Sequence, residues 1–297
     1  MVPLLVRLRH VTVVTAVAVA CTSLTGQPVY ASPSVNPRHV EVPMRADGFD
    51  LPEVTQAGWV TFTAVTDDPA GHQLEGFQTR GGATPEQVVD DIRRATSYDP
   101  ASAVAGVADT RRDAVLVGGP STDPATPVSV TLALVPGTYW FFDFDDFYTP
   151  EQQVRLHRMD LVGPFRGDAP DASGEIVETM VGDAPHFGVS GHLSATSTIA
   201  VRNTGDELHE MLLARVRPRT TDQDVQDYYS SGSPETPAWM LEPPLRGVAA
   251  MDPGRTAYVR FPKLSPGSYA LLCFVPDDET ALPHVVEGMH AVVQIRR

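Results

Sequence analysis

Basic residues are scarce in this sequence, and lysine is almost absent. The 297 residues include 22 lysines and arginines against 37 aspartates and glutamates, Lys263 is the only lysine, and the formal net charge at pH 7 is -15. Proteins that bind nucleic acids or anionic membranes need clustered basic side chains to neutralise phosphates. We therefore predict no nucleic-acid partner and no attachment to an anionic membrane surface.

Long apolar runs and the common catalytic motifs are missing as well. No run reaches the roughly 18 apolar residues that a transmembrane helix needs, so we predict no transmembrane span. The motifs GxGxxG, GxxxxGK[ST], GxSxG and HExxH do not occur, which removes the usual support for nucleotide binding and for the commoner hydrolase reactions. The chain does have 42% hydrophobic residues, enough for a core, and 27 prolines, which favour turn-rich β structure.

Residues 1–31 have the pattern of a secretory signal peptide. Arg7 and Arg9 precede the apolar run 11–20, which is too short to span a bilayer. Two processing routes stay open: a lipoprotein signal ending before Cys21, which would put a lipid anchor on that cysteine, or cleavage after Val29-Tyr30-Ala31, which would release a free protein. In both cases we expect an exported protein, either secreted or periplasmic.

Cysteine is nearly absent, with two residues in the whole chain. Either processing route lipidates or removes Cys21, so Cys273 is left as a lone thiol. A lone cysteine in an oxidising compartment has no intramolecular disulfide to form and needs another role.

The remaining chain is an internal repeat. When His72 is aligned with His209, the flanking sequence matches without a gap, for example Thr84 with Thr221 and Asp90 with Asp227. Further along, Pro136-Gly137-Thr138-Tyr139 matches Pro266-Gly267-Ser268-Tyr269. We therefore predict two tandem domains, 38–163 and 174–297, joined by a linker rich in Gly, Pro and Asp.

Each copy has the pattern of an all-β domain. Alternating segments such as 59–65 (WVTFTAV) and 197–203 (STIAVRN) predict strands, and Pro-Gly turn signals separate them. This pattern predicts two tandem Greek-key β-sandwiches. Each carries a short inserted helix, for which Thr84 and Thr221 are the expected N-caps.

Four residues of the second copy form a set of candidate metal ligands: His209, Cys273, His284 and Met289. Two imidazoles, a thiolate and a weak thioether suit a copper ion that changes between Cu(I) and Cu(II).

In these residues, together with Asn203-Thr204-Gly205 and Pro266–Tyr269, the second copy resembles the cupredoxins, the plastocyanin/azurin-like blue copper domains. The resemblance implies that His209, Cys273, His284 and Met289 bind one copper ion. It also implies one-electron transfer in the periplasm or at the outer face of the cell membrane, with a redox or copper-donor protein as partner. By the duplication, it implies the same fold for the first copy.

Two features depart from the cupredoxin pattern. Ten residues, 274–283, separate Cys273 from His284, whereas family members have two to four, and Glu210 follows His209 where an asparagine is common. Leu272 and Phe274 flank Cys273, and no His-x-His occurs. Copper oxidases and reductases use such histidines for a second copper centre, so we expect no enzyme activity.

The first copy keeps His72 and Met159 but has Asp143 in place of Cys273 and Val154 in place of His284. We therefore expect no type 1 copper there, and a structural or docking role with His72 packed or hydrogen-bonded. The acidic runs 143–146 and 277–279 are expected to be solvated loops.

Two alternatives to electron transfer stay open. One is a metal-free cupredoxin-like interaction module at the cell surface, and the other is a Cu(I) carrier that does not cycle between oxidation states. The sequence leaves the oligomeric state undetermined.

Overall fold

The computed structural model describes residues 37–148 and 153–297, apart from the side chains of 242–244. The predicted signal peptide 1–31 and Cys21 lie outside the described residues. Within the described residues, no helix combines the length and the apolar character required to cross a membrane.

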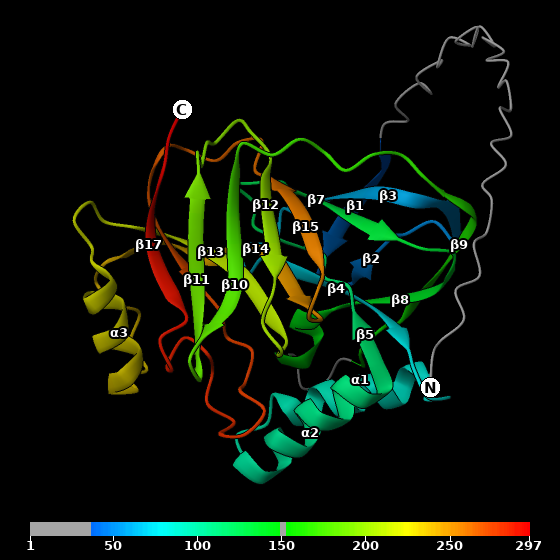
Figure 1. Ribbon diagram of the computed structural model, residues 1–297, viewed down its shortest axis with the longest axis horizontal. Helices are drawn as coiled ribbons and strands as arrows, with labels where there is room; N and C mark the ends of the chain where they lie inside the picture. The colour runs from blue at the N-terminus through cyan, green and yellow to red at the C-terminus, as the bar shows by residue number, and fades with distance from the viewer. Residues whose placement is uncertain (1–36, 149–152) are drawn as a thin grey trace, which may run out of the picture. The chain divides into compact units, whose positions relative to one another are not determined.

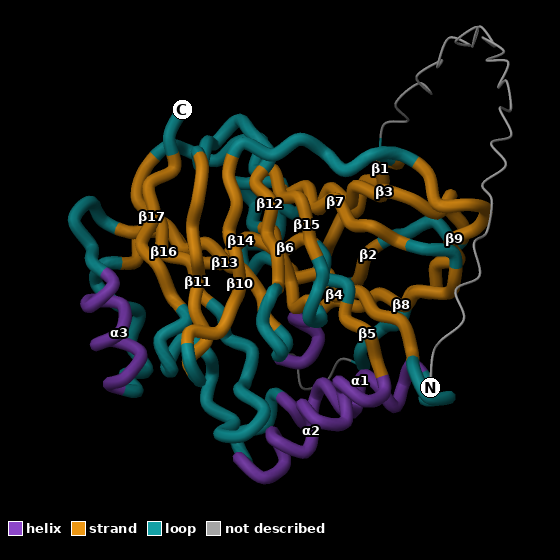
Figure 2. Tube along the Cα trace, viewed as in Figure 1, coloured by secondary structure: helices purple, strands orange, loops and turns teal. Residues whose placement is uncertain are grey.

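Strands dominate the described residues, and the helices lie outside the sheets (Figure 1, Figure 2). The first half contains, in order, β1 (Arg38–Arg45), β2 (Gly48–Phe49), β3 (Val54–Val65), β4 (His72–Thr79), α1 (Pro85–Ala95), α2 (Pro100–Asp113), β5 (Ala114–Leu116), β6 (Pro120–Thr122), β7 (Val128–Leu134), β8 (Gly137–Asp143), the short 3-10 helix η1 (Phe144–Tyr148) and β9 (His157–Arg166). The second half contains β10 (Gly174–Val181), β11 (Ala184–Gly191), β12 (Ile199–Asn203), β13 (His209–Val216), α3 (Asp222–Ser231), β14 (Met240–Met251), β15 (Thr256–Arg260), β16 (Gly267–Leu272) and β17 (His290–Ile295).

The two halves repeat the same strand pairing. In the first half β3 pairs parallel with β1 and antiparallel with β7, and in the second half β12 pairs parallel with β10 and antiparallel with β15. Likewise β4–β8–β9 corresponds to β13–β16–β17. The predicted all-β class is confirmed, and the strand pairing repeats between the two halves as the internal repeat predicts.

An apolar core lies between the sheets of each half. In the second half, Val201 of β12 and Ala257 of β15 belong to the same buried cluster as Leu213 of β13 and Leu271 of β16. Because alternate residues of each strand face this cluster, burying the apolar face of both sheets stabilises the sandwich.

The halves are also joined to each other by strands. β15 pairs with β7, with Ala257 opposite Leu132, and β14 pairs with β6. The described residues therefore form one compact unit. β9 continues to Arg166 because Arg166 pairs with Gly58, so the strand extends into the segment expected as linker. The domain boundaries themselves stay a prediction.

A tyrosine with the same hydrogen bond occurs in each half. The Tyr139 hydroxyl donates to the Val135 carbonyl at 3.2 Å, and the Tyr269 hydroxyl donates to the Ser265 carbonyl at 2.7 Å. Both rings are fully buried. The two Pro-Gly-x-Tyr segments thus occupy equivalent places, as their alignment in the sequence predicts.

The inserted helices begin where expected. Thr84 accepts from the Gln87 amide and caps α1, and Thr221 forms a capping box with Asp224 at the start of α3. The first half also contains α2, which the sequence does not predict because its alanine-rich segment has no clear amphipathic pattern. Gly106 allows α2 to approach α1 closely, since a Cβ there would lie 2.2 Å from the Ala95 nitrogen.

Candidate metal centre

The structure brings three of the four predicted ligands together. His209 begins β13, Cys273 follows the paired strand β16, and His284 ends the loop after Cys273. One ligand atom from each lies within 4.8 Å of the other two, and all three side chains are fully buried. The His209 and His284 Nδ1 atoms are 3.1 Å apart, and Cys273 Sγ is 3.5 Å from His284 Nδ1.

The loop between Cys273 and His284 folds back on itself like a hairpin. Pro276 forms an isolated bridge with Pro283, and the Asp277 amide donates to the Leu282 carbonyl at 2.9 Å. At the base of the loop, the Val285 amide donates to the Cys273 carbonyl at 2.7 Å. The ten extra residues therefore project outward as a closed loop and leave His284 beside Cys273.

The distances suit a single metal ion. Metal–nitrogen and metal–sulfur bonds of about 2.0–2.3 Å, arranged trigonally, place the ligand atoms roughly 3.5 Å from one another. The measured separations of 3.1 and 3.5 Å are close to this value. Two imidazoles and one thiolate are a donor set that copper accepts in both of its common oxidation states.

Glu207 fixes the orientation of His284. Its Oε2 atom lies 2.9 Å from His284 Nε2, and its side chain is only 12% exposed. The Nε2–H group of His284 donates to this carboxylate, so the Nδ1 lone pair is directed at His209 and Cys273. The fully buried Asn203 holds the preceding turn, because its side-chain NH2 donates to the Glu207 carbonyl at 2.8 Å.

Burial favours the uncharged forms of the His209 and Cys273 side chains. Burial, with a further contribution from His284, lowers the pKa of His209 to about 3. Burial also raises the pKa of the Cys273 thiol well above its ordinary value, and the nearby Glu210 adds to the effect. The neutral His209 imidazole has a lone pair that can bind a cation, and a bound cation would displace the proton of the Cys273 thiol.

Met289, the fourth predicted ligand, is fully buried in the same apolar core as Cys273. Its amide donates to the His284 carbonyl at 2.8 Å, which keeps this part of the chain beside the site. Its role as a ligand stays a prediction.

Glu210 organises the surroundings of the sulfur. Its amide donates to Cys273 Sγ at 3.5 Å, and its carboxylate accepts from the Phe274 amide at 3.0 Å and from the Gln73 side chain at 3.2 Å. The carboxylate does not belong to the group of three converging ligands. It connects the metal centre to β4 of the first half.

The corresponding position in the first half holds an ion pair. His72 Nδ1 lies 2.6 Å from Asp143 Oδ2, and both side chains are buried. Burial opposes protonation of His72, but the hydrogen bond and charge of Asp143, with Asp145 and Asp68, outweigh it and raise the His72 pKa.

The expectation of solvated acidic loops is wrong for Asp143, Asp146 and Asp277, whereas Glu279 is exposed. Asp143 and Asp146 are buried, since Asp143 pairs with His72 and Asp146 accepts from the Arg155 amide at 3.4 Å. Asp277 is also buried, because its side chain accepts the Glu279 and Thr280 amides and closes the turn of the long loop. Local composition predicts exposure here, whereas specific partners from the folded chain permit burial.

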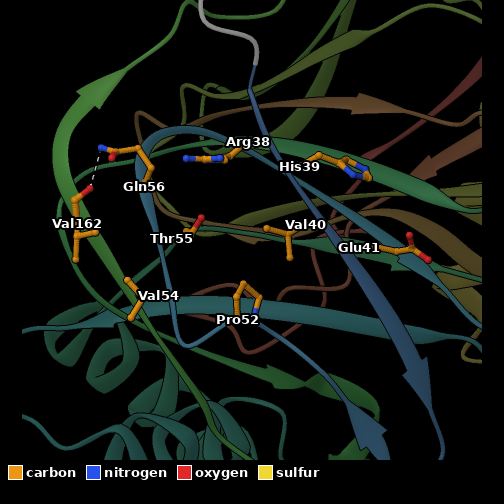
Figure 3. A pocket seen from close by; sticks show the side chains of 9 residues that line it. All are labelled: Arg38, His39, Val40, Glu41, Pro52, Val54, Thr55, Gln56 and Val162. Carbon is orange, nitrogen blue, oxygen red and sulfur yellow. Dashed lines mark hydrogen bonds between the residues drawn. The ribbon is translucent and has the colours of Figure 1, made fainter.

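Residues elsewhere in the described chain do not extend the site. His290 Nε2 lies 2.9 Å from the Gln226 side chain of α3, so His290 faces that helix. An open hollow of about 660 Å³ lies where β1, β3 and β9 meet (Figure 3). Its one histidine, His39, is hydrogen-bonded to Thr63, and its lining offers no cluster of metal ligands.

No family model matches this chain, and no curated protein matches it by sequence. Similar solved structures include auracyanin from Roseiflexus castenholzii (18% identity over 41% of this chain and 95% of that one, TM-score 0.25). Another is rusticyanin from Thiobacillus ferrooxidans, with 15% identity over 41% of this chain and 76% of that one and a TM-score of 0.25. A third is a blue copper oxidase from Nitrosomonas europaea, with 10% identity over 88% of this chain and 86% of that one and a TM-score of 0.24.

These similar structures are cupredoxins and a multicopper oxidase. At these identities and TM-scores, the fold assignment rests on the strand pairing described above. The candidate site rests on its own geometry.

Proposed function

We propose that the second half of this protein binds one copper ion and uses it for one-electron transfer. His209, Cys273 and His284 supply two nitrogens and a sulfur, and Met289 adds a weak fourth ligand. The observation that carries the proposal is the convergence of the first three ligand atoms within 4.8 Å in a fully buried pocket.

The chain's own residues prepare this site. Glu207 orients the His284 ring, and the Glu210 amide, by donating to Cys273 Sγ, stabilises negative charge on the sulfur. Copper, when bound, would supply an electron acceptor and donor whose two oxidation states this mixed ligand set tolerates. The buried apolar surroundings exclude water and limit rearrangement between those states.

Electron transfer fits the chain better than oxidase chemistry, although a blue copper oxidase is among the similar structures. An oxidase requires further copper ions held by paired histidines, and the sequence has no His-x-His. The other groups of three candidate ligands in the described chain are dominated by carboxylates. We therefore propose that the protein is not an enzyme and that it exchanges electrons or copper with another protein.

Export completes this proposal. A signal peptide within residues 1–31 would direct the chain to the periplasm or the cell exterior, with Cys21 as a lipid anchor if the lipoprotein route operates. In such an oxidising compartment a cysteine commonly forms a disulfide. Cys273 has no cysteine partner among the described residues, so its thiol is available to bind a metal.

The test is titration of the purified metal-free protein with Cu(II). We expect an intense visible charge-transfer band at one equivalent, absent in Cys273→Ser and retained in Asp143→Asn, which alters the corresponding residue of the first half. A colourless protein without tight copper binding would falsify the proposal and favour the metal-free interaction module.

Copper holding is a second candidate, because the His284 side chain is fully buried and its outer nitrogen is covered by Glu207. No exposed imidazole edge is then available for rapid electron exchange. Tight Cu(I) binding without a reversible voltammetric wave would favour holding, and a reversible wave would favour electron transfer.

A further inference from the structure

A cavity of about 620 Å³ lies between the two halves, next to the candidate metal centre. The first half contributes side chains from β4, α1, α2 and η1, and the second half contributes β13, β14 and the loop 274–283. The cavity has the volume of an ordinary small-molecule site. The metal centre does not use it, although Glu210 and Phe274 belong to both surroundings.

The walls of the cavity are mostly apolar. Side chains that are buried or partly buried line it from both halves, among them Ile92, Val107, Leu116, Leu208, Leu212 and Phe274. An apolar molecule that fills this space would remove both its own surface and these side chains from water, which favours binding.

Acidic side chains outnumber basic ones in the lining. Glu75, Asp145 and Glu210 belong to it, whereas the one basic side chain among the described lining residues, His72, is paired with Asp143 at 2.6 Å. Glu75 and Glu210 are buried, and the Glu210 carboxylate accepts hydrogen bonds from the Phe274 amide and the Gln73 side chain. Burial raises the pKa of Asp145 to about 6, the charge of Asp143 adds to this effect, and His72 opposes it.

We propose that this cavity binds a small apolar molecule carrying a protonated amine. The apolar body fills the space between α1, α2 and the loop, and the ammonium group donates to the Asp145 carboxylate. No lysine or arginine is among the described lining residues, so an ammonium ion would supply a cationic partner for Asp145, whereas a carboxylate ligand would meet like charge there.

The helices α1 and α2 of the first half, which form the insertion 85–113, contribute to this cavity. Residues of α1 and α2 and residues of the loop 274–283 both line the cavity. Arg111 of α2 forms an ion pair with Asp278 and donates to the Asp206 carbonyl at 2.6 Å, so α2 is tied to the loop. The second half without this insertion would lack the lining residues that α1 and α2 supply.

The experiment compares three probes with the same apolar body: 2-phenylethylammonium, 2-phenylethanol and 3-phenylpropanoate. Each is titrated calorimetrically into the metal-free full chain at pH 8, so the result does not depend on copper. We expect the ammonium to bind at least tenfold more tightly than the alcohol, and the carboxylate not to bind detectably. Equal or tighter binding of the alcohol or the carboxylate would overturn the proposal.

Two variants locate the binding. Asp145→Asn should weaken the ammonium about tenfold and leave the alcohol unchanged, whereas Asp171→Asn, the same change at an exposed residue outside the lining, should alter neither. Ala250→Phe fills part of the cavity and should weaken both probes. Unchanged ammonium binding in Ala250→Phe, or an equal loss of both probes in Asp145→Asn, would contradict the proposed site.

Discussion

The two halves of this protein have different side chains at the same place in the repeated strand pairing. In the second half, His209 faces a buried thiol and a second imidazole, whereas in the first half His72 faces a buried carboxylate at 2.6 Å. A buried imidazole needs a partner that satisfies it. In the first half Asp143 is this partner, and we propose that a metal ion is the partner in the second half.

The pKa values express this difference. His72 has a raised pKa because its acidic partners outweigh burial, and His209 has a pKa of about 3 because burial and His284 act in the same direction. In the first half, the contact with Asp143 that raises the His72 pKa also occupies the Nδ1 atom of His72.

The largest expected effect is the copper dependence of stability. Copper at a thousandfold excess over its Kd should raise the free energy of unfolding by roughly 4 kcal/mol, since it binds the folded state. Cys273→Ser should lose this increase, and Asp143→Asn should keep it. Thermal unfolding with and without Cu(II) measures the effect. A copper-linked increase that depends on Asp143 instead would reverse the assignment of the two halves.

Asp143→Ala should destabilise the copper-free protein by about 3 kcal/mol, because it breaks a buried pair. The contribution of His72 is also pH-dependent. Its folded pKa lies above the unfolded value of 6.5, so this stability is fully present below pH 6.5 and is lost as the pH rises through the folded pKa.

Denaturant unfolding of the wild type and Asp143→Ala between pH 5.5 and 9 checks this prediction. The difference in the free energy of unfolding should shrink toward high pH. A difference that grows with pH would show that His72 is not protonated in the pair.

Glu207→Gln should reduce copper affinity by about 10- to 100-fold, as expected when a carboxylate that orients a histidine ligand is neutralised. The visible band should persist because the three ligands remain. Glu235→Gln, at an exposed position of the second half, is the matched control. Competition with a copper chelator measures the affinity, and equal affinities of the two variants would remove Glu207 from the site.

The smallest expected effect is that of Arg111→Ala, which cuts the connection between α2 and the loop 274–283. Partly exposed ion pairs contribute about 0–1 kcal/mol, so global stability should change little. Hydrogen exchange of the Asp277 and Ala281 amides, both bonded within the loop, should become faster. Arg93→Ala, which breaks an ion pair confined to α1, should leave these two amides unchanged.

Much of the fold follows from local sequence. The strand alternation, the Thr84 and Thr221 caps and the paired Pro-Gly-x-Tyr segments all depend on residues close together in the chain, and the structure confirms them. The second helix α2 was not predicted, because packing against α1 rather than an amphipathic pattern positions it.

For the candidate metal site, too, some features follow from the sequence and others only from the tertiary structure. The sequence by itself determined which residues could ligate a metal, because ligand chemistry belongs to the side chain: His209, Cys273, His284 and Met289. Only the tertiary structure decided that the long loop closes, that Glu207 orients His284, and that Asp143 is buried against His72. Each of these depends on groups brought together by strand pairing across the fold. The Cys273 thiol therefore lies beside the His209 and His284 imidazoles only because the chain folds.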